Sequence, residues 1–533
     1  MAAAGARRRG LLLAAAGAAA LAAPRIAPAQ TRASTLRFAP QGNLANADPV
    51  WTTTTLARNH GLMVYDTLFG LDAQLRPKPQ MAASHEVSPD GLVHRIALRP
   101  GLKFHDGEPV RAADCVASIA RWSKRDVLGQ RFQVLLADMR SVDDGTLEIA
   151  LRRPWPGLAW ALGKPSANIC AVMPERVAQT DPFRQVTDYT GSGPFRFRAD
   201  QWVPGSLAAY ERFAEYAPRD EPADFLAGGK RVHFGRIEWR VMPDPGTAAA
   251  ALRAGEVDWW EQPLADLLPV LRRDRNIAVE VVNTFGALGM LRFNHLHPPF
   301  DNPGIRRAVF PAIDQRAFMQ AALGEDPALW RVPAGVFTPG TPLANDAGME
   351  VLTGPRSTEA ARRALASAGY RGESVVILSP SDLPIISALS EVAADTLRRA
   401  GMAVDLQVMD WGTLVQRRAK REPPSQGGWN AFCTTWEGLD VSVPGSHQAA
   451  RGNGLEGWIG WAGSDRREAL RDAWFDAASP EAEKRIAEDI QRVVWDEAPF
   501  VPLGLLRPPQ AFRRDLAGIV TGGPPLFWNV RRG

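Results

Sequence analysis

The chain has few cysteines for its length, three among 533 residues. An odd number of cysteines cannot form a complete disulfide framework, so a fold held together by disulfides is excluded. Cys115 shares the apolar face of a predicted helix with Ile119 and Trp122, and Cys433 lies in a short apolar run. Both patterns favour packing over redox chemistry. The sequence leaves open whether these two thiols or Cys170 ever pair.

An excess of one charge is also missing once the first 29 residues are set aside. The whole chain has 62 Lys and Arg against 58 Asp and Glu, a formal net charge of +4. Arg7, Arg8, Arg9 and Arg25 lie in the first 29 residues, which hold no acid, so the remainder is balanced at 58 basic and 58 acidic residues. A balanced chain gives no electrostatic basis for binding nucleic acid or an anionic membrane.

Motifs of the common hydrolases and nucleotide-binding enzymes are absent. The sequence has no Gly-x-Ser-x-Gly elbow, no His-Glu-x-x-His zinc helix and no P-loop. His295 and His297 form a pair without cysteines or carboxylates at ligand spacing, which is too little for a metal site. The sequence also lacks the repeats and low-complexity segments that are typical of an adhesin. We therefore expect no catalytic residues, no metal and no cofactor, and a secreted hydrolase is the less favoured alternative.

The N-terminus has the three parts of a secretory signal peptide. A basic stretch, Arg7 to Arg9, precedes an apolar run from Leu11 to Ala23, and Ala27-Pro28-Ala29 offers a small-x-small cleavage site. The run is too short to span a bilayer, and no later stretch reaches that length without charges. Arg8-Arg9 also resembles a twin-arginine signal, although Sec export stays open. We expect residues 1–29 to be a signal peptide and, because no cysteine lies near the cleavage site, a periplasmic protein without a lipid anchor.

Residues 373–410 give the clearest secondary-structure signal. Val375 to Leu378 is an apolar run suited to a strand buried on both faces, and residues 383–400 have helical periodicity that ends before Gly401. Val404 to Val408 then alternates as a second strand. This order predicts a βαβ unit with parallel strands, which binds ligands beyond the carboxyl ends of its strands. Weaker signals predict strands at 36–38, 94–98 and 102–104, a helix at 111–122 and a hairpin turning at Asp144-Gly145.

Short motifs follow one another along the chain in the order found in a known family. Those before residue 200 are Tyr65-Asp66-Thr67-Leu68-Phe69, Glu86-Val87-Ser88-Pro89-Asp90-Gly91, Leu98-Arg99-Pro100-Gly101 with His105-Asp106-Gly107, and Gly191-Ser192-Gly193-Pro194-Phe195. Later ones include Ala251-Leu252-Arg253-Ala254-Gly255-Glu256-Val257-Asp258, Phe293-Asn294 and Ile305-Arg306-Arg307-Ala308. Together they resemble the family 5 extracellular solute-binding proteins, which include the dipeptide- and oligopeptide-binding proteins of ABC importers.

The resemblance implies an α/β, two-lobed periplasmic-binding-protein fold of type II, in its large class with an extra inserted subdomain. The ligand cleft then lies between lobes joined by a two-crossing hinge, which we expect near residues 287–294 and 497–504. The expected boundaries are 30–74, 185–290 and 498–533 for lobe I, 75–184 for its inserted subdomain and 291–497 for lobe II. Ligand binding closes the hinge of such proteins, and the ABC permease reads the closed form. The implied partners are a small solute and the permease and ATPase subunits, and we expect a monomer.

The resemblance also implies a binding loop around Trp436. In the peptide binders of the family, an Asp three residues after this Trp pairs with the amino terminus of the peptide. Here Leu439 stands at that position and the carboxylate comes one residue later, at Asp440. The solute is therefore expected to be a peptide or peptide-like molecule, with an opine, amino-acid derivative, sugar or metal chelate as the alternative. The expected ligand-binding residues are Asn43, Tyr65, Ser192, Gly193, Asn294, Trp411, Trp436, Glu437 and Asp440, with Trp259 and Trp260 as cleft wall or, alternatively, lobe core.

Overall fold

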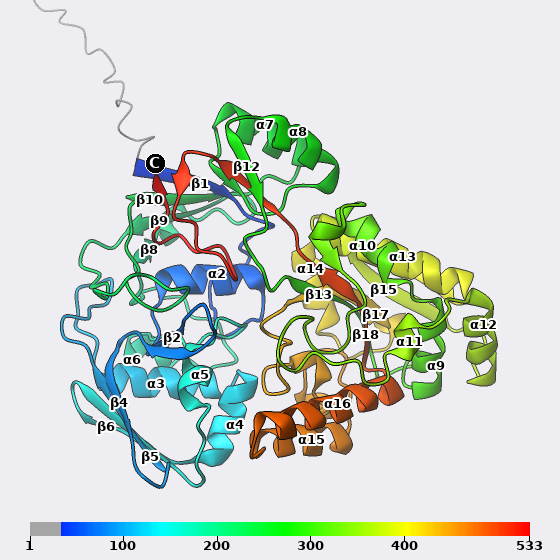
Figure 1. Cartoon of the computed structure of the whole chain (residues 1–533), viewed down its shortest axis with the longest axis horizontal. Helices are drawn as coiled ribbons and strands as arrows, with labels where there is room; N and C mark the ends of the chain where they lie inside the picture. The colour runs from blue at the N-terminus through cyan, green and yellow to red at the C-terminus, as the bar shows by residue number, and fades with distance from the viewer. Residues whose placement is uncertain (1–33) are drawn as a thin grey trace, which may run out of the picture.

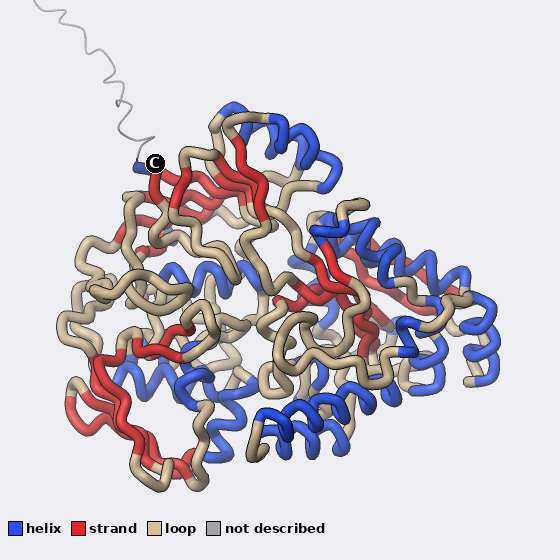
Figure 2. Tube along the Cα trace, viewed as in Figure 1, coloured by secondary structure: helices blue, strands red, loops and turns tan. Residues whose placement is uncertain are grey.

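The computed structural model describes residues 34–533, which fold into two lobes side by side (Figure 1). The expected signal peptide lies outside the described residues. Within them, no helix is long and apolar enough to cross a membrane. Each lobe is built around one large sheet, and a smaller sheet with its helices forms a subdomain of lobe I (Figure 2). Cys115, Cys170 and Cys433 are buried and unpaired.

Lobe I has a seven-stranded mixed sheet in the order β12-β19-β11-β1-β10-β9-β8. The expected strand at 36–38 is β1, which runs parallel to β10 and β11. Aromatic rings fill its core, where Phe38 contacts Trp239, Trp259 and Phe527 with ring centroids 5.8, 5.4 and 5.0 Å away. The elements are β1 (Thr35–Ala39), β8 (Phe195–Phe197), β9 (Leu207–Arg212), β10 (Arg236–Arg240), β11 (Trp259–Trp260), β12 (Ile277–Glu280), β19 (Gln510–Arg513), α2 (Thr55–Val64), α7 (Pro245–Ala254) and α8 (Leu268–Arg273).

The subdomain carries a four-stranded antiparallel sheet, β4-β5-β7-β6, and its apolar core is continuous with that of lobe I. The predicted strand at 94–98, the hairpin at Asp144-Gly145 and the helix at 111–122 are all confirmed. The predicted strand at 102–104 is wrong, because Phe104 bonds back to Glu108 in a tight turn and β5 pairs with β4 and β7. The elements are β4 (Ala82–Val87), β5 (Val93–Leu98), β6 (Leu136–Asp143), β7 (Thr146–Leu151), α3 (Ala112–Ser123), α4 (Val127–Leu135), α5 (Leu158–Gly163) and α6 (Glu175–Ala178).

Lobe II has a six-stranded sheet in the order β14-β18-β13-β17-β15-β16. The predicted βαβ unit is confirmed: β15 and β16 pair in parallel and α13 connects them. Gly401 just beyond α13 has a left-handed φ of +96°, which ends the helix at no steric cost. The strands are β13 (Ala287–Phe293), β14 (Trp330–Arg331), β15 (Ser374–Pro380), β16 (Ala403–Met409), β17 (Ala431–Glu437) and β18 (Phe500–Leu506). The helices are α9 (Pro303–Ala308), α10 (Gln315–Leu323), α11 (Glu350–Thr353), α12 (Thr358–Ser367), α13 (Pro384–Arg399), α14 (Trp411–Arg418), α15 (Asp465–Phe475) and α16 (Pro480–Glu497).

The chain passes between the two large sheets at places that differ from those expected. β12 belongs to the lobe I sheet and β13 to the lobe II sheet, so the first crossing is residues 281–286. β18 pairs with β13, and β19 pairs with β12, so the second crossing is residues 507–509. The expected crossings at 287–294 and 497–504 overlap β13 and β18, which lie inside the lobe II sheet.

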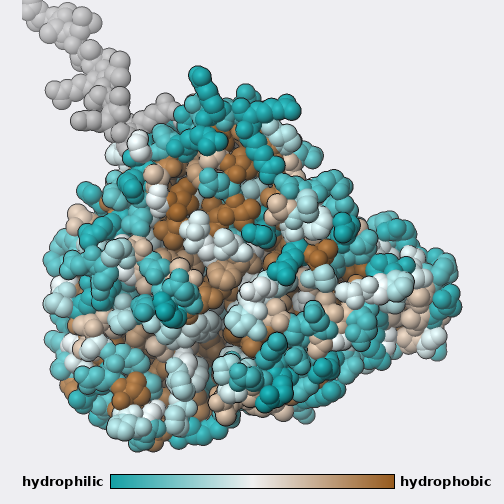
Figure 3. Space-filling view, in the orientation of Figure 1, coloured by the Kyte–Doolittle hydropathy of each residue, from teal (hydrophilic) through white to brown (hydrophobic). Residues whose placement is uncertain are grey.

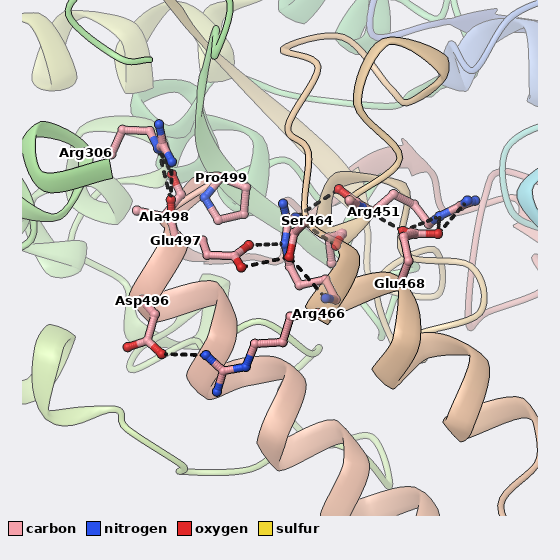
Figure 4. A network of polar contacts seen from close by, with 12 residues as sticks. Arg306, Arg451, Ser464, Arg466, Glu468, Asp496, Glu497, Ala498 and Pro499 are labelled. Carbon is pink, nitrogen blue, oxygen red and sulfur yellow. Dashed lines mark hydrogen bonds and ion pairs between the residues drawn. The ribbon is translucent and has the colours of Figure 1, made fainter. Parts of the chain in front are cut away.

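A polar network fixes the end of α16 just before β18 (Figure 4). The Glu497 carboxylate accepts hydrogen bonds from Ser464 Oγ and Arg467 Nε, both at 2.7 Å. Arg306 donates to the backbone oxygens of Glu497 and Ala498 at 2.7 and 3.1 Å. Because the last carbonyls of a helix lack partners within the helix, these bonds satisfy them and tie α9, α15 and α16 together. The start of β18, the last strand of lobe II, is therefore held in place.

Candidate functional site

A cavity lies between the lobes. Gln41, which follows β1, and residues 53–56 at the start of α2 line it on the lobe I side. The lobe II side includes the second half of β17 and segments that follow the carboxyl ends of β15, β16 and β17, the edge at which α/β sheets bind ligands. The lining residues from lobe II are Leu383, Ile386, Trp411, Arg418, Thr434, Thr435, Trp436, Glu437, Asp440 and Trp458.

Asp440 is a buried carboxylate in the wall of this cavity, only 4% exposed. Its Oδ1 accepts a hydrogen bond from the backbone N–H of Ala167 at 3.1 Å, across the lobe boundary. Burial raises the pKa of Asp440 to about 6, although Arg58 and Lys164 pull it down. The carboxylate is therefore mostly ionised at neutral pH but poorly solvated, which favours a cationic ligand group as its partner.

Glu437 connects the cavity to both lobes. Its Oε2 accepts a hydrogen bond from Asn283 Nδ2 at 2.6 Å, and Asn283 lies in the first crossing. Its Oε1 lies 3.5 Å from Arg58 Nη2 of α2. Arg58 in turn donates to Asn59 Oδ1 at 2.8 Å. This carboxylate is held by Arg58 of lobe I and Asn283 of the crossing, whereas Asp440 accepts a hydrogen bond only from a backbone N–H among residues 34–533.

Three tryptophans supply flat walls. Trp436 and Trp458 make an edge-to-face contact with ring centroids 5.1 Å apart. The indole N–H of Trp436 is buried and has no hydrogen-bond partner among residues 34–533, so it is a donor available to a ligand. Trp411 begins α14, whose N-cap residue Asp410 accepts a hydrogen bond from Thr413 N. Trp411 and Trp436, both expected as ligand-binding residues, line the cavity.

Three of the expected residues lie instead in the core of lobe I, and their contacts explain the family motifs structurally. Tyr65 is 1% exposed and packs in the lobe I core. Ser192 Oγ donates to Val172 O at 2.8 Å and accepts from Asp66 N at 3.0 Å. A Cβ on Gly193 would come within 2.7 Å of Met63 O, so this glycine allows two backbone segments, not a ligand, to approach. None of Tyr65, Ser192 and Gly193 lines the cavity.

Asn294 and Trp259 also have structural partners. Asn294 is fully buried and donates from Nδ2 to Trp429 O at 2.8 Å. Trp259 belongs to the aromatic core of lobe I and donates to Gln510 Oε1 at 2.7 Å. Neither residue lines the cavity, and for Trp259 the alternative of lobe core agrees with its position.

Asn43 and Trp260 line a neighbouring cavity that shares Gln41 with the first. Asn43 Oδ1 accepts a hydrogen bond from Gly205 N at 2.7 Å. Most of the residues that line this neighbouring cavity are apolar, including Pro243 and Leu264. Apolar side chains are also gathered below α7 and α8 in the surface view, while the outer faces of both lobes are hydrophilic (Figure 3).

Several lining residues were not expected from the sequence. The Thr53-Thr54-Thr55 run presents hydroxyl groups at the start of α2. A run of threonines directly before an apolar-periodic segment is a signal that points to this helix terminus. Arg418 gave no such signal, because a basic residue at the end of a helix is usually explained by the helix dipole. Within residues 34–533, no three His, Cys, Asp or Glu side chains are grouped as metal ligands.

Comparison with known proteins gives one family. Residues 76–442 match the profile of the bacterial extracellular solute-binding proteins, family 5 Middle. A probable peptide ABC transporter periplasmic-binding protein of Sinorhizobium fredii is 38% identical over 519 residues, covering 96% of this chain and 97% of that protein. A glutathione-binding protein of Salmonella typhi is 26% identical over 489 residues, covering 89% and 90% of the two chains.

Two solved structures share the fold at lower identity. A periplasmic binding protein of Agrobacterium tumefaciens R10 in complex with agropinic acid superposes with a TM-score of 0.77 at 20% identity, over 94% of this chain and 99% of that one. A periplasmic binding protein of Helicobacter pylori in complex with the peptide STSA gives a TM-score of 0.77 at 20% identity, over 93% and 98%. The expected two-lobed α/β fold is confirmed by these likenesses.

Proposed function

The chain belongs to the family 5 bacterial extracellular solute-binding proteins, and on this premise we propose that it captures a peptide or peptide-like solute between its lobes for an ABC importer. The observation that carries the proposal is the cavity between the lobes, with Asp440 buried in its wall. The partners are then the permease and ATPase of the importer. The protein acts in the periplasm as a monomer and releases its solute chemically unchanged.

The groups around the cavity match the chemistry of a short peptide. Asp440 is suited to an ammonium group, because a desolvated carboxylate gains most from a full positive charge. The indole N–H of Trp436 and the hydroxyls of residues 53–55 are suited to peptide carbonyls and amides. Trp411 and Trp458 offer apolar faces that tolerate different side chains.

A non-peptide solute is the second candidate. The carboxylate at Asp440, one residue later than in the peptide binders, is the specific feature that favours it. One protein of the same fold was crystallised with agropinic acid, and a 26% identical relative is named for glutathione.

Replacing Asp440 by Asn tests the proposal. Asparagine keeps an acceptor for Ala167 N but removes the charge, so we expect peptide affinity to fall roughly tenfold or more, the size of a charge-assisted hydrogen bond. The melting temperature without ligand should stay the same or rise, because a poorly solvated charge is lost. Calorimetric titration with a tripeptide library and thermal melting with and without peptide measure the two effects.

The control is Asp405→Asn on the exposed part of β16, which removes the same charge away from the cavity. It should leave both measurements unchanged. A wild-type protein that shows no peptide-dependent rise in melting temperature, and that co-purifies with no solute by native mass spectrometry, would contradict capture between the lobes. Release of a hydrolysed product would favour the hydrolase alternative instead.

A further inference from the structure

Arg418, the last residue of α14, is a buried cation without a counter-ion. It is 5% exposed, and its guanidinium lies over the rings of Trp411 and Phe432, 4.9 and 5.4 Å from their centroids. Its side chain donates no hydrogen bond and forms no ion pair with any residue from 34 to 533, and its Nε is buried without a partner. Burial lowers the pKa of Arg418 to about 10, so the group is still charged at neutral pH.

Two other buried guanidinium groups of lobe II have hydrogen-bond or ion-pair partners. Arg292 is 1% exposed and donates to the carbonyls of Ile459 and Ala449 at 2.8 and 2.9 Å. Arg467 is 2% exposed and is paired with Glu497 at 2.7 Å. A buried guanidinium without such partners costs several kcal/mol, on the order of the desolvation penalty of an ion. Arg418 is therefore the exception among these three arginines.

Arg418 also lies where a ligand can reach it. It lines the cavity between the lobes and a larger adjoining cavity, and the two share Thr53 and Trp458. The basic residues that line the larger cavity are Lys124, Arg125, Arg418, Arg421 and Arg451, against one acid, Glu456. Of these basic residues only Arg451 forms an ion pair within residues 34–533, with Glu468 at 2.8 Å.

We propose that Arg418 binds a carboxylate of the solute and that the basic residues beside it favour solutes with further negative charge. The proposal rests on the proposed function and narrows it to anionic peptide-like solutes. The contacts with the two aromatic rings leave the N–H groups of the guanidinium without acceptors among residues 34–533, and a carboxylate can accept from them. Asp440 lines the same cavity, so one solute can present an ammonium group to Asp440 and a carboxylate to Arg418.

The test compares Ala-Ala-Ala, Ala-Ala-Glu and the C-terminal amide of Ala-Ala-Ala by calorimetric titration. With the wild-type protein we expect Ala-Ala-Ala to bind roughly tenfold or more tightly than its amide, because a carboxylate–guanidinium hydrogen bond is charge-assisted. Ala-Ala-Glu should bind at least as tightly as Ala-Ala-Ala. In Arg418→Met, which keeps an apolar side chain against Trp411, the acid and amide should bind equally, and the melting temperature without ligand should not fall.

Arg485→Gln, on the exposed side of α16, is the control and should keep the wild-type preference. Equal affinity of the wild-type protein for acid and amide would overturn the role of Arg418 while leaving peptide capture intact. Absence of binding by all three peptides would overturn this proposal together with the capture of short peptides. The comparison of the acid with the amide uses only the wild-type protein. The proposal can therefore still be refuted if Arg418→Met folds poorly.

Discussion

Glu261 is a buried carboxylate directly behind the loop that lines the cleft on lobe I. It follows β11, is 5% exposed, and accepts a hydrogen bond from the backbone N–H of Gln41 at 2.7 Å. No cation forms an ion pair with it among residues 34–533. Burial raises the pKa of Glu261 to about 7, from an ordinary value of 4.5. The proton on this side chain is therefore more strongly held in the folded protein than in the unfolded chain.

The stability of the unliganded protein should consequently fall as Glu261 ionises. A carboxyl whose pKa is raised by folding contributes stability below its unfolded pKa, and that contribution is lost as the pH rises through its folded pKa. The loss should approach about 3 kcal/mol above pH 7, because a tenfold change in an acid dissociation constant corresponds to about 1.4 kcal/mol. Glu261→Gln should therefore be close to wild type at pH 4.5 and more stable than wild type above pH 7.

Denaturant unfolding of both proteins across this range measures the difference. Glu280→Gln, on an exposed position of β12, is the matched control and should give a flat difference. A flat difference for Glu261→Gln as well would mean that the side chain is solvated or paired in solution.

At the scale of elements, the first crossing has a tightly constrained backbone at Gly286. Gly286 has a left-handed φ of +64°, and a Cβ there would lie 2.4 Å from Leu506 O at the end of β18. The same turn holds Asn283, whose side chain bonds Glu437 of the cavity. The first crossing is thus packed against the end of β18, and it is joined to the binding site through Asn283.

Gly286→Ala should be more destabilising than an ordinary glycine replacement. It adds a clash with backbone to the cost of a left-handed φ, which by itself is about 1 kcal/mol. Gly101→Ala is the matched control, because Gly101 has a φ of +77° with nothing within 4 Å of the added Cβ. We expect a loss of unfolding free energy of about 1 kcal/mol in the control and clearly more in Gly286→Ala, measured by denaturant unfolding. Equal losses would show that the crossing relaxes to admit the methyl group.

The sequence predicts elements well where the signal is local, as in the βαβ unit from β15 to β16. The apolar run, the helical period and Gly401 all lie within a few turns of each other. The crossings were misplaced by about one strand each, because β13 and β18 belong to lobe II only through pairing with each other and with β17. A local sequence pattern does not show which strand, far along the chain, pairs with a given strand.

The same distinction applies to the cavity. Trp436 and Glu437 end β17 and Asp440 follows it, and the three were expected together because they are neighbours in sequence. Tyr65 and Ser192 belong to family motifs, but these motifs pack lobe I and do not line the cavity. Arg418 was not predicted as a site residue. The absence of a counter-ion near its guanidinium among residues 34–533 depends on how the chain folds around it, and the sequence near position 418 does not show this.

At the scale of the whole molecule, the lobes are joined by contacts at both the cavity and its outer rim. Arg131 of α4 lies 3.2 Å from Asp472 and 3.3 Å from Asp476, both on the α15 side of lobe II. Arg471 of α15 donates to Val127 O at the start of α4, at 3.1 Å. α4 and α15 lie side by side at the lower edge of the molecule, where the subdomain meets lobe II (Figure 1). These contacts are broken if the hinge opens.

The acidic rim residues should therefore bias the protein towards the closed form. Each exposed ion pair is worth about 0.2–1 kcal/mol, so Asp472→Asn with Asp476→Asn should weaken solute affinity by up to roughly tenfold through a smaller closed population. The radius of gyration of the unliganded protein should increase, and raising the salt concentration should have the same direction of effect on wild type. Asp489→Asn, which affects only an ion pair within α16, is the control. If the scattering and titration results for the double variant both match wild type, the rim contacts form as a result of closure and do not stabilise the closed form. The closed state would then depend on the cavity residues alone.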